Sequence, residues 1–493
     1  MTDSVKKPFD KAQGKQPVRV RMAPSPTGPL HLGTARTTLF NWLFAKSHNG
    51  KIILRIEDTD LERSKKEYEE DIINGLKWLG FDWDEGPDVG GQYGPYRQNE
   101  RLDIYEKYLN KFFDEEKIYY CFCSKEQLEE DRQAMLSQGM APKYGGRCRN
   151  LDPKEAKKRV ENGERAAIRF KVPPIEVEFT DIIRGKVAVN AELIGDIVIA
   201  RNLRSPLFMF AGVVDDFEMK ISHVIRGEDH ITNTPKQILL QRALGFDEVK
   251  YAHLPLILAP DRSKLSKRHL ETSLNDYRVE GFLPEALVNF LAFLGWHPTE
   301  DKEIMSIEEL IEEFDLRRVQ KGGAAFNVVK LDWFNGQYIQ KMDSYELLNR
   351  LEDFIPKIWL ENQDLLIKII DVEKSRMNSL AVFKNLAEPF FELPAYDKKL
   401  LLWKDVSEKD TRRNLKMLSE EISKIPESDF GKKRLEQVIM PLTEVWGRGE
   451  LLWPLRAGLS GREASAGPFE LMDILGKDES LKRIKSAADK FNA

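Results

Sequence analysis

The chain has 493 residues, of which 41% are hydrophobic and 32% are charged, and its formal net charge is −5. This length exceeds what one hydrophobic core normally supports, so we expect two to four domains. No apolar run approaches the roughly 18 to 20 residues that span a bilayer, so we expect no membrane partner. Three cysteines exclude a disulfide framework and favour a reducing, cytoplasmic compartment. The nearly balanced charge neither indicates nor excludes a nucleic-acid partner, because such binding depends on local patches.

Strands and helices alternate after a polar stretch, residues 1–16, which we expect to be a disordered tail. Short segments with apolar centres predict buried strands, and apolar residues spaced three and four apart predict helices. The pattern runs strand, helix, strand, helix over residues 18–22, 31–48, 51–57 and 65–79. This order predicts a Rossmann-like parallel sheet with crossover helices, whose first half spans residues 17–118.

Shorter strands and turns follow over residues 119–204, which predicts an insertion of α+β character. The sheet domain is expected to resume over residues 205–260. Its predicted elements are two strands and a helix, at 206–214, 223–226 and 235–244. Beyond about Leu270 the pattern is helical almost throughout. Three tryptophans are expected to anchor the core of that half: Trp403, Trp446 and Trp453. The predicted fold class is therefore multidomain, an α/β part followed by an all-α part.

A proline- and glycine-rich turn with the sequence APSPTGPLHLG joins the first strand to the first helix. Parallel sheets bind ligands at the carboxyl ends of their strands, and a helix N-terminus at that edge offers N–H groups and a positive dipole to phosphate. Glycines let a ligand approach the backbone, while histidine, serine and threonine supply donors. The residues proposed to contact a nucleotide are Ser25, Thr27, Gly28, His31 and Gly33. An ordinary rigid turn with a surface histidine is the alternative, and the turn alone does not decide between them.

A second polar segment, with the sequence DRSKLSKR, follows the apolar run 254–259 and carries four basic residues. Displacement at a phosphorus builds negative charge, which the compact ammonium of lysine stabilises. A basic run taken alone is more often a solvated loop, so the functional interpretation depends on the presence of the first motif.

The sequences PSPTGPLHLGTAR and KLSKR, in this order and about 230 residues apart, resemble the two signatures of class I aminoacyl-tRNA synthetases. Between them, RIEDTD, VVDD, VIRGEDH and NTPKQ resemble the glutamyl-specific, bacterial-type members. LAFLGWH and LWPLRAGLSGREASAGPF extend the resemblance to nearly the whole chain from about residue 18. One such motif would be weak support, whereas several in register are very specific.

The resemblance implies a two-step reaction without a protein nucleophile. Glutamate attacks the α-phosphorus of ATP, which is bound with Mg²⁺, and the terminal adenosine of tRNA(Glu) then takes the glutamyl group from the adenylate. By motif, the catalytic residues would be His31, Lys264 and Lys267, with Gly33 and Ser266 as further contacts to ATP. Whether tRNA(Gln) is charged as well is left open, and a monomer is expected.

Glutamate carries two carboxylates and one ammonium, so its pocket needs cations and an anion. In the resemblance, Arg21 and Arg226 fit as carboxylate readers, Glu57 as the ammonium partner and Ser25 as an additional donor. In the resemblance, an arginine at position 226 also distinguishes the glutamyl enzymes, which bind a carboxylate, from the glutaminyl enzymes, which bind an amide and have an uncharged residue there. Phe208 stands where the family usually has a tyrosine, which removes a hydroxyl from the pocket. Structural ion pairs are the alternative for the charged residues.

All three cysteines fall in one pattern, Cys121, Cys123 and Cys148. Some family members bind zinc with this spacing and with a histidine two residues after the third cysteine, but here that residue is Asn150. Structural zinc normally takes four firm ligands, so Tyr144 or water would have to complete the set. A zinc site and three reduced thiols therefore both remain open.

The resemblance also assigns the domains that would bind tRNA. Residues 119–204 correspond to an acceptor-binding insertion, 261–335 to a stem-contact domain that carries the KLSKR loop, and 336–493 to a helical anticodon-binding domain. Basic residues considered for contacts to tRNA are Arg317, Arg318, Lys321, Arg448, Arg456 and Arg462.

Three other functions are weighed against this one. An adenylyltransferase that acts without RNA is disfavoured by the long helical half and by the segment 224–230. A paralogue that glutamylates a modified tRNA base would be shorter and would lack the anticodon-binding domain. A non-catalytic RNA-binding relative should have a degraded lysine loop, and KLSKR is intact.

Overall fold

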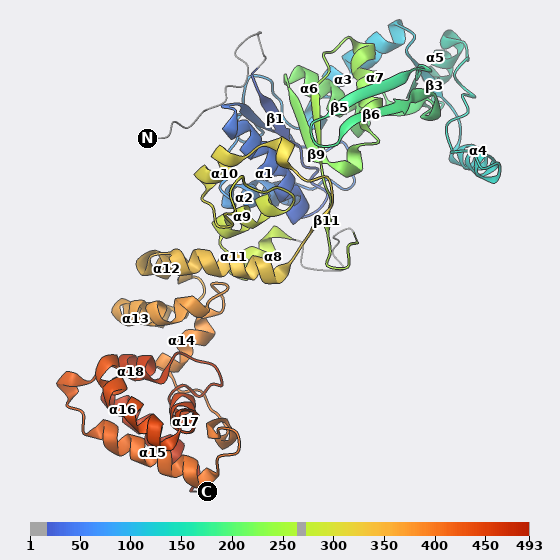
Figure 1. Cartoon of the computed structure of the whole chain (residues 1–493). Coiled ribbons are helices and arrows are strands. Elements are labelled where there is room, and N and C mark those ends of the chain that lie inside the picture. Colours follow the sequence, from blue (N-terminus) through green and yellow to red (C-terminus); the bar gives the residue numbers. More distant parts are fainter. Residues whose placement is uncertain (1–16, 264–272, 493) are drawn as a thin grey trace. The chain divides into compact units, whose positions relative to one another are not determined.

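The computed structural model describes residues 17–263 and 273–492. Within them the predicted fold class is confirmed, since a part built on parallel strands comes first and an all-helical part follows (Figure 1). No helix in this part of the chain is long and apolar enough to cross a membrane.

The chain forms two compact units. The first, here called the sheet unit, comprises the described residues up to Asp276 together with Leu287–Asn327. The second, the helical unit, comprises Tyr277–Ala286 and the described residues from Val328 onward.

The main strands of the sheet unit come from distant parts of the sequence. They are β1 (Arg19–Met22), β2 (Lys51–Leu54), β5 (Glu176–Asp181), β6 (Gly185–Asn190), β9 (His223–Gly227) and β10 (Lys250–Leu254). β1 runs parallel to β2, and in the order β6-β5-β10-β9 both β5 and β9 run parallel to β10. Ser222 links β1 to the start of β9, because its N–H donates to the carbonyl of Arg19 at 2.9 Å. The strands of both sequence halves therefore share one sheet surface.

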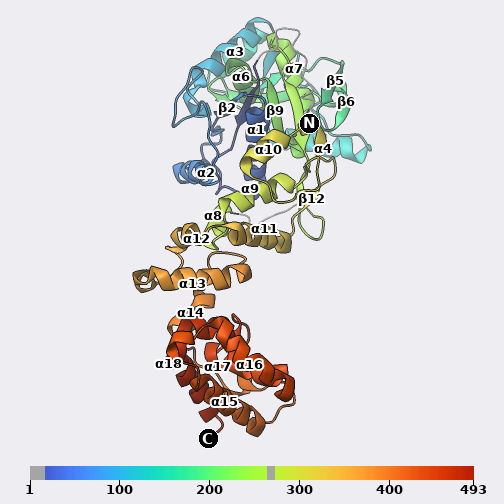
Figure 2. The same ribbon diagram turned by 60° about the vertical axis from the view of Figure 1, so that its left-hand side comes forward.

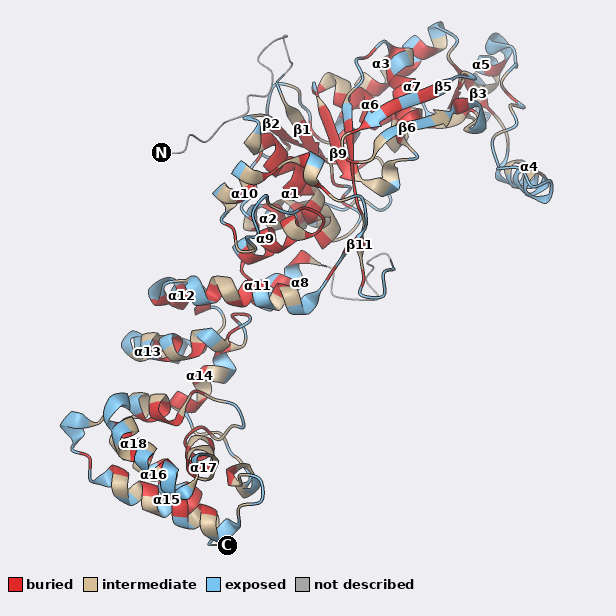
Figure 3. Cartoon of the chain, viewed as in Figure 1, coloured by how far each residue is buried: buried red, intermediate tan, exposed pale blue. Residues whose placement is uncertain are grey.

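Helices flank this surface. They are α1 (Leu32–Ser47), α2 (Lys66–Trp78), α3 (Leu102–Asp114), α6 (Phe208–Glu218), α7 (Thr234–Leu244) and α10 (Ile307–Glu313), with α8 (Leu274–Val279) and α9 (Pro284–Phe293) where the chain passes between units. α1 packs on β1, β2 and β9, and most of its side chains are buried, as the colours of Figure 3 show. Its residues Leu39, Phe40 and Leu43 are fully buried. A helix of this kind is apolar on most sides because the sheet and α10 cover it.

The stretch predicted as an insertion has two structural parts. Its strands β3 (Ile118–Cys121), β4 (Ala167–Phe170) and β7 (Ile197–Asn202) form an antiparallel sheet with β8 (Ser205–Pro206), accompanied by α4 (Lys125–Ser137) and α5 (Pro153–Glu161). The hairpin of β5 and β6 instead extends the main sheet, where Asp181 is in register with Tyr251 of β10. The inserted stretch thus supplies the edge strands of the main sheet. The other strands of that sheet come from the residues before and after the stretch.

One predicted strand is wrong. Residues 206–214 belong mostly to the helix α6, which begins at Phe208. Seven consecutive residues of this helix, from Phe210 to Asp216, are buried. A helix covered on all sides has no polar face, so its short apolar run cannot be distinguished from a buried strand by periodicity.

The helical unit contains α11 (Val328–Lys341), α12 (Ser344–Leu351), α13 (Gln363–Glu373), α14 (Phe383–Phe391), α15 (Glu408–Ser423), α16 (Lys432–Trp446), α17 (Arg448–Ser460) and α18 (Pro468–Asp489), the last kinked at Gly476 (Figure 2). Its core consists of aliphatic and phenylalanine side chains such as Leu347, Phe383 and Leu415. The expectation of a tryptophan core is wrong, because Trp446 is 39% exposed, and Trp403 and Trp453 are only half-buried, with their rings 5.1 Å apart.

A buried ionic cluster joins α6 to α3. Both carboxylate oxygens of Asp215 are occupied: Arg101 donates to Oδ1 at 2.7 Å, and Gln98 and Tyr105 donate to Oδ2 at 2.8 Å each. The Asp215 and Arg101 side chains are 0% and 1% exposed. A buried charge is tolerated only when it is paired and hydrogen-bonded.

We predict that Asp215→Asn lowers the free energy of unfolding by about 3 to 5 kcal/mol, because Arg101 then keeps its charge without a buried counter-ion. Urea unfolding followed by circular dichroism measures the change. The matched control is Glu164→Gln, which breaks an exposed pair with Arg159 and should leave the midpoint unchanged. Equal midpoints for the two variants would contradict the prediction.

Candidate active site

A cavity of about 550 Å³ opens at the carboxyl ends of β1 and β9. Most residues that the sequence singled out for ligand contacts line it: Arg21, Ser25, Thr27, His31, Gly33, Glu57, Phe208 and Arg226. Gly28 is not among the lining residues. The site is therefore assembled by both halves of the sheet unit, with the N-terminus of α1 on its wall.

The proline-rich turn is held in place by backbone hydrogen bonds. The carbonyl of Pro24 accepts from the N–H of Glu57, and that of Pro26 accepts from Lys65, both at 3.0 Å. His31 is the N-cap of α1, where its Nδ1 accepts from the N–H of Thr34 at 3.3 Å. The exposed imidazole thus lies at the positive end of the helix dipole, a location that favours an anionic ligand.

The two glycines of the turn differ in their surroundings. A Cβ added to Gly33 would lie 3.1 Å from the His31 ring, so a larger residue would crowd the histidine that caps α1. A Cβ added to Gly28 would meet no heavy atom of the described residues within 4 Å. No packing contact with the described residues therefore requires glycine at position 28.

A cluster of buried charges lies at the cavity, and three of its members, Arg21, Glu57 and Arg226, line it. The guanidinium of Arg55, which is fully buried, donates to Asp216 at 2.7 Å and to Glu57 at 2.8 Å. Arg21 donates to the same Oδ1 of Asp216 at 3.3 Å. Arg226 is 6% exposed and faces the same cavity. Three cations and two carboxylates thus lie close together in a place with little water.

Burial and charge pairing act against each other in this cluster. At Glu57 burial outweighs Arg55 and Arg21, and the pKa of its carboxyl is raised. At Asp216 burial acts in the same direction, but Arg55 and Arg21 outweigh it, and the pKa is lowered. Burial lowers the pKa of Arg226 to about 10, which leaves it charged near neutral pH. Of these two carboxylates, Glu57 is therefore the one whose ionised form an added cation would favour.

Sequence reasoning did not assign roles to Arg55 or Asp216, although both lie within motifs quoted for the family resemblance. Each is a charged residue in an apolar segment, and that is the signal that could have identified them. Phe208 begins α6, and its ring centroid lies 5.5 Å from that of His230, so the missing hydroxyl leaves an aromatic wall to the cavity.

The second motif lies mostly outside the described residues, which include neither Lys264 nor Ser266 nor Lys267. The turn that leads into it is described: Ser263 donates through its N–H and its hydroxyl to Asp261 Oδ1, at 2.9 and 2.7 Å. This turn follows β11 (Ile257–Leu258), whose Ile257 lines the cavity.

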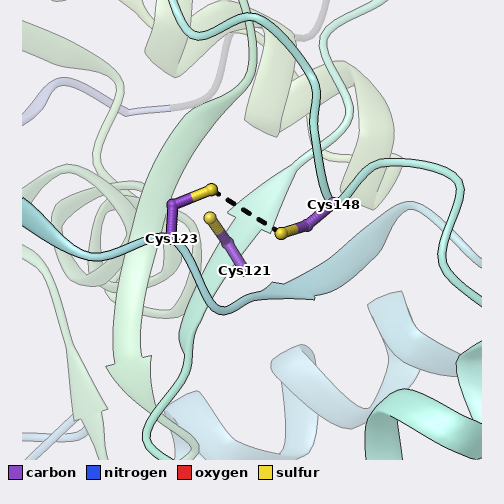
Figure 4. A group of neighbouring side chains, drawn as sticks. All are labelled: Cys121, Cys123 and Cys148. Carbon is purple, nitrogen blue, oxygen red and sulfur yellow. Dashed lines mark hydrogen bonds between the residues drawn. The ribbon is translucent and has the colours of Figure 1, made fainter. Parts of the chain in front are cut away.

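The three cysteines meet at the end of β3 (Figure 4). Their sulfur atoms all lie within 4.8 Å of one another, and Cys123 Sγ is 3.7 Å from Cys148 Sγ. The hydroxyl of Tyr144 lies 3.4 Å from the sulfurs of Cys121 and Cys123. The sulfur separation matches the edge of about 3.8 Å that a tetrahedron with Zn–S bonds of about 2.3 Å would have. Three thiols are donors that zinc accepts, and the Tyr144 hydroxyl, which accepts from the N–H of Cys148 at 3.0 Å, is a candidate for the fourth ligand.

Most of the arginines considered for tRNA contacts are engaged within the protein. The contacts are Arg317 with Asp315, Arg318 with Glu313, Arg456 with the carbonyl of Glu463, and Arg462 with Glu388. A contact to RNA would have to compete with these partners.

Comparison with known proteins agrees with this geometry. Residues 17–333 match the family model of the catalytic domain of class I tRNA synthetases (E and Q), and residues 346–488 match an anticodon binding domain. The chain is 43% identical to glutamate–tRNA ligase 2 of Caldicellulosiruptor saccharolyticus, over 96% of this chain and 99% of that protein. It is 44% identical to glutamate–tRNA ligase 1 of Syntrophomonas wolfei, over 96% of each. A crystal structure of a glutamate tRNA ligase from Elizabethkingia meningosepticum, in complex with its amino acid, has a TM-score of 0.85 at 38% identity and covers 96% of this chain and 99% of its own.

The fold and the sequence matches together define a class I tRNA synthetase with a catalytic and an anticodon-binding part. The chain belongs to the branch of that family specific for glutamate and glutamine, and the relatives named above are glutamate–tRNA ligases.

Proposed function

We propose that this chain is a glutamate–tRNA ligase, which activates L-glutamate with ATP and transfers it to tRNA(Glu). In the first step a carboxylate oxygen of glutamate attacks the α-phosphorus of ATP, and the bond to pyrophosphate breaks. In the second step a ribose hydroxyl of the 3′-terminal adenosine attacks the glutamyl carbonyl, and AMP leaves. The observation that carries the proposal is the cavity that Arg21, Glu57 and Arg226 share with the N-terminus of α1.

The charged side chains of this cavity complement the groups of L-glutamate. Arg21 and Arg226 offer guanidinium groups to its two carboxylates, and bidentate pairing gives such contacts both strength and direction. Glu57 offers a carboxylate to the ammonium. Burial raises the pKa of Glu57, and an ammonium beside it would favour the ionised form that this contact requires.

The wall of the cavity formed by Ser25, Thr27 and His31 is suited to the triphosphate. Hydroxyl and imidazole donors and free N–H groups of the first helical turn bind phosphate oxygens without a full positive charge. The described lining residues include only two carboxylates, Glu57 and Asp229, so Mg²⁺ would be carried mainly by the triphosphate. Lys264 and Lys267 would supply the cations that stabilise the charge on the departing pyrophosphate.

The extent of the anticodon-binding match, residues 346–488, supports a tRNA substrate, and a small-molecule adenylyltransferase would not need it. The proposal includes action as a monomer, and it leaves to the charging experiment whether tRNA(Gln) is a substrate as well as tRNA(Glu).

Charging of purified tRNA(Glu) and tRNA(Gln) with radioactive glutamate and with glutamine tests the function. We expect glutamate to be attached to tRNA(Glu), and no glutamine to be attached to either tRNA. Lys267→Ala should abolish pyrophosphate exchange while tRNA binding, measured by filter retention, stays within about twofold, because it removes a charge needed at the transition state. Exchange that runs equally well without tRNA would instead favour the adenylyltransferase.

A second variant tests the glutamate pocket. Arg226→Gln should raise the KM for glutamate by roughly 10- to 100-fold, since hydrogen bonds to a charged group contribute about 1.5 to 3 kcal/mol. The KM for ATP should stay within about twofold. The control is Arg242→Gln on α7, an exposed arginine that pairs with Glu248 and should leave both constants unchanged. An unchanged KM for glutamate in Arg226→Gln would remove this residue from the pocket.

We also propose that Cys121, Cys123, Cys148 and Tyr144 hold a structural zinc ion. Zinc would join the end of β3 to the segment before α5, where the local core is limited to a few residues around these cysteines. The metal would add rigidity to the inserted sheet and would not enter the reaction.

Metal analysis by mass spectrometry of the full-length protein tests the zinc site. We expect about one zinc per chain, a loss of most of it in Cys123→Ser, and weaker retention against a chelator in Tyr144→Phe. Tyr120→Phe, which removes a hydroxyl on the same strand as Cys121, is the control and should retain the metal. Less than about one tenth of a zinc per chain in the unaltered protein would establish three ordinary thiols.

A further inference from the structure

Arg226 is held from behind by two buried polar side chains. Its Nη2 donates to Thr234 Oγ1 at 2.7 Å, and its Nε donates to His253 Nε2 at 3.3 Å. Its Nη1 makes no hydrogen bond to any described residue, and the side chain lines the cavity. Two of the three guanidinium nitrogens are thus held by protein side chains, and the third, Nη1, has no hydrogen-bond partner among the described residues.

These contacts determine the protonation of His253. An arginine N–H can only donate, so His253 Nε2 must be the unprotonated nitrogen and Nδ1 must carry the hydrogen. Nδ1 lies 2.7 Å from Asp181 Oδ2, to which it donates. The other oxygen of Asp181 accepts from the N–H groups of Ile183 and Arg184, at 2.9 and 2.8 Å. The hydrogen bonds are therefore donated in one direction, from Arg226 to His253 and from His253 to Asp181.

All three supporting residues are inaccessible to solvent. Thr234 and His253 are 0% exposed, and Asp181 is 1% exposed. Burial lowers the pKa of His253 and outweighs the opposing effect of Asp181, so the imidazole is neutral near neutral pH. A neutral ring is required here, because an imidazolium would lose its acceptor and place a second cation beside Arg226.

The three residues come from separate parts of the sheet unit. His253 on β10 is in register with Arg226 on β9, whereas Asp181 ends β5 and Thr234 begins α7. β5 belongs to the stretch between the two halves of the sheet domain. None of these three residues lines the cavity, and the mechanism proposed above does not use them.

We propose that Asp181, His253 and Thr234 are positioning residues that fix the orientation of Arg226, and that they thereby set the affinity and selectivity for the dicarboxylate substrate. The inference rests on the proposed function. A guanidinium that is fixed on two nitrogens presents one edge to the ligand, so a carboxylate fits while the amide NH₂ of glutamine meets donors that cannot rotate away. It also avoids the entropy cost of ordering a long side chain when substrate binds.

The test compares Thr234→Val, which has nearly the same shape without the hydroxyl, with Thr234→Ser, which retains it. Steady-state charging of tRNA(Glu) by the full-length protein gives the KM for glutamate, the KM for ATP and kcat, and inhibition by glutamine gives the selectivity. Thr234→Val should raise the KM for glutamate roughly tenfold and weaken discrimination against glutamine, with kcat and the KM for ATP within about twofold. Thr234→Ser should be close to the unaltered protein.

A second pair of variants, at His253, provides a test that does not depend on the folding of the Thr234 variants. His253→Gln can accept from Arg226 and donate to Asp181, whereas His253→Leu can do neither. Among variants with an unchanged melting temperature, the leucine variant should show the same selective rise in the KM for glutamate, and the glutamine variant should be restored in part. The proposal is overturned if the KM for glutamate is unchanged in Thr234→Val and His253→Leu, or if all kinetic constants deteriorate together. If the unaltered protein charges no tRNA with glutamate, the proposed function itself fails, which is a separate outcome.

Discussion

The fully buried guanidinium of Arg55 is the interaction on which the rest of the site depends. It lies on the chain directly after β2, and Asp216, its partner at 2.7 Å, lies on α6 after the inserted stretch. Burial disfavours the charged form of Arg55, but Asp216, Glu57 and Asp215 outweigh it and raise its pKa. A buried cation that is paired in this way cannot move without exposing uncompensated charge, so it fixes the two sequence halves of the sheet unit against each other.

The paired charged side chains determine the electrostatic potential of the cavity. Arg21, Arg55 and Arg226 contribute three positive charges, and Glu57 and Asp216 contribute at most two negative ones. Among these five side chains the positive charges exceed the negative ones, and Asp215, 3.9 Å from Arg55, and Asp229, which lines the cavity, add negative charge beside them. L-Glutamate at neutral pH carries one net negative charge, and its ammonium would stabilise the ionised form of Glu57.

The sheet brings together, at this site, residues that are far apart in the sequence. Parallel strands bring their carboxyl ends to one edge, and there β1 supplies Arg21, β9 supplies Arg226 and the turn after β1 supplies His31. The added strand β5 brings Asp181 to the back of the same layer, where it reaches Arg226 only through His253. The residues that line the cavity thus lie at one edge of the sheet, and the residues that hold Arg226 lie behind them.

The sequence by itself determined the alternation of strands and helices in the first half, the helical character of the second, and the identity of several residues that line the cavity. Local signals were sufficient for these, because the APSPTGPLHLG turn, the charged residues Arg21, Glu57 and Arg226, and the helical periodicity each occupy short stretches. Only the tertiary structure decided that residues 208–218 are a helix, that the tryptophans lie outside the helical core, and that β5 joins the main sheet. It also decided which partners hold Arg55 and Arg226. The physical reason is that burial on all sides removes periodicity, and that ion pairs such as Arg55 with Asp216 join residues 161 positions apart, whose proximity no local pattern encodes.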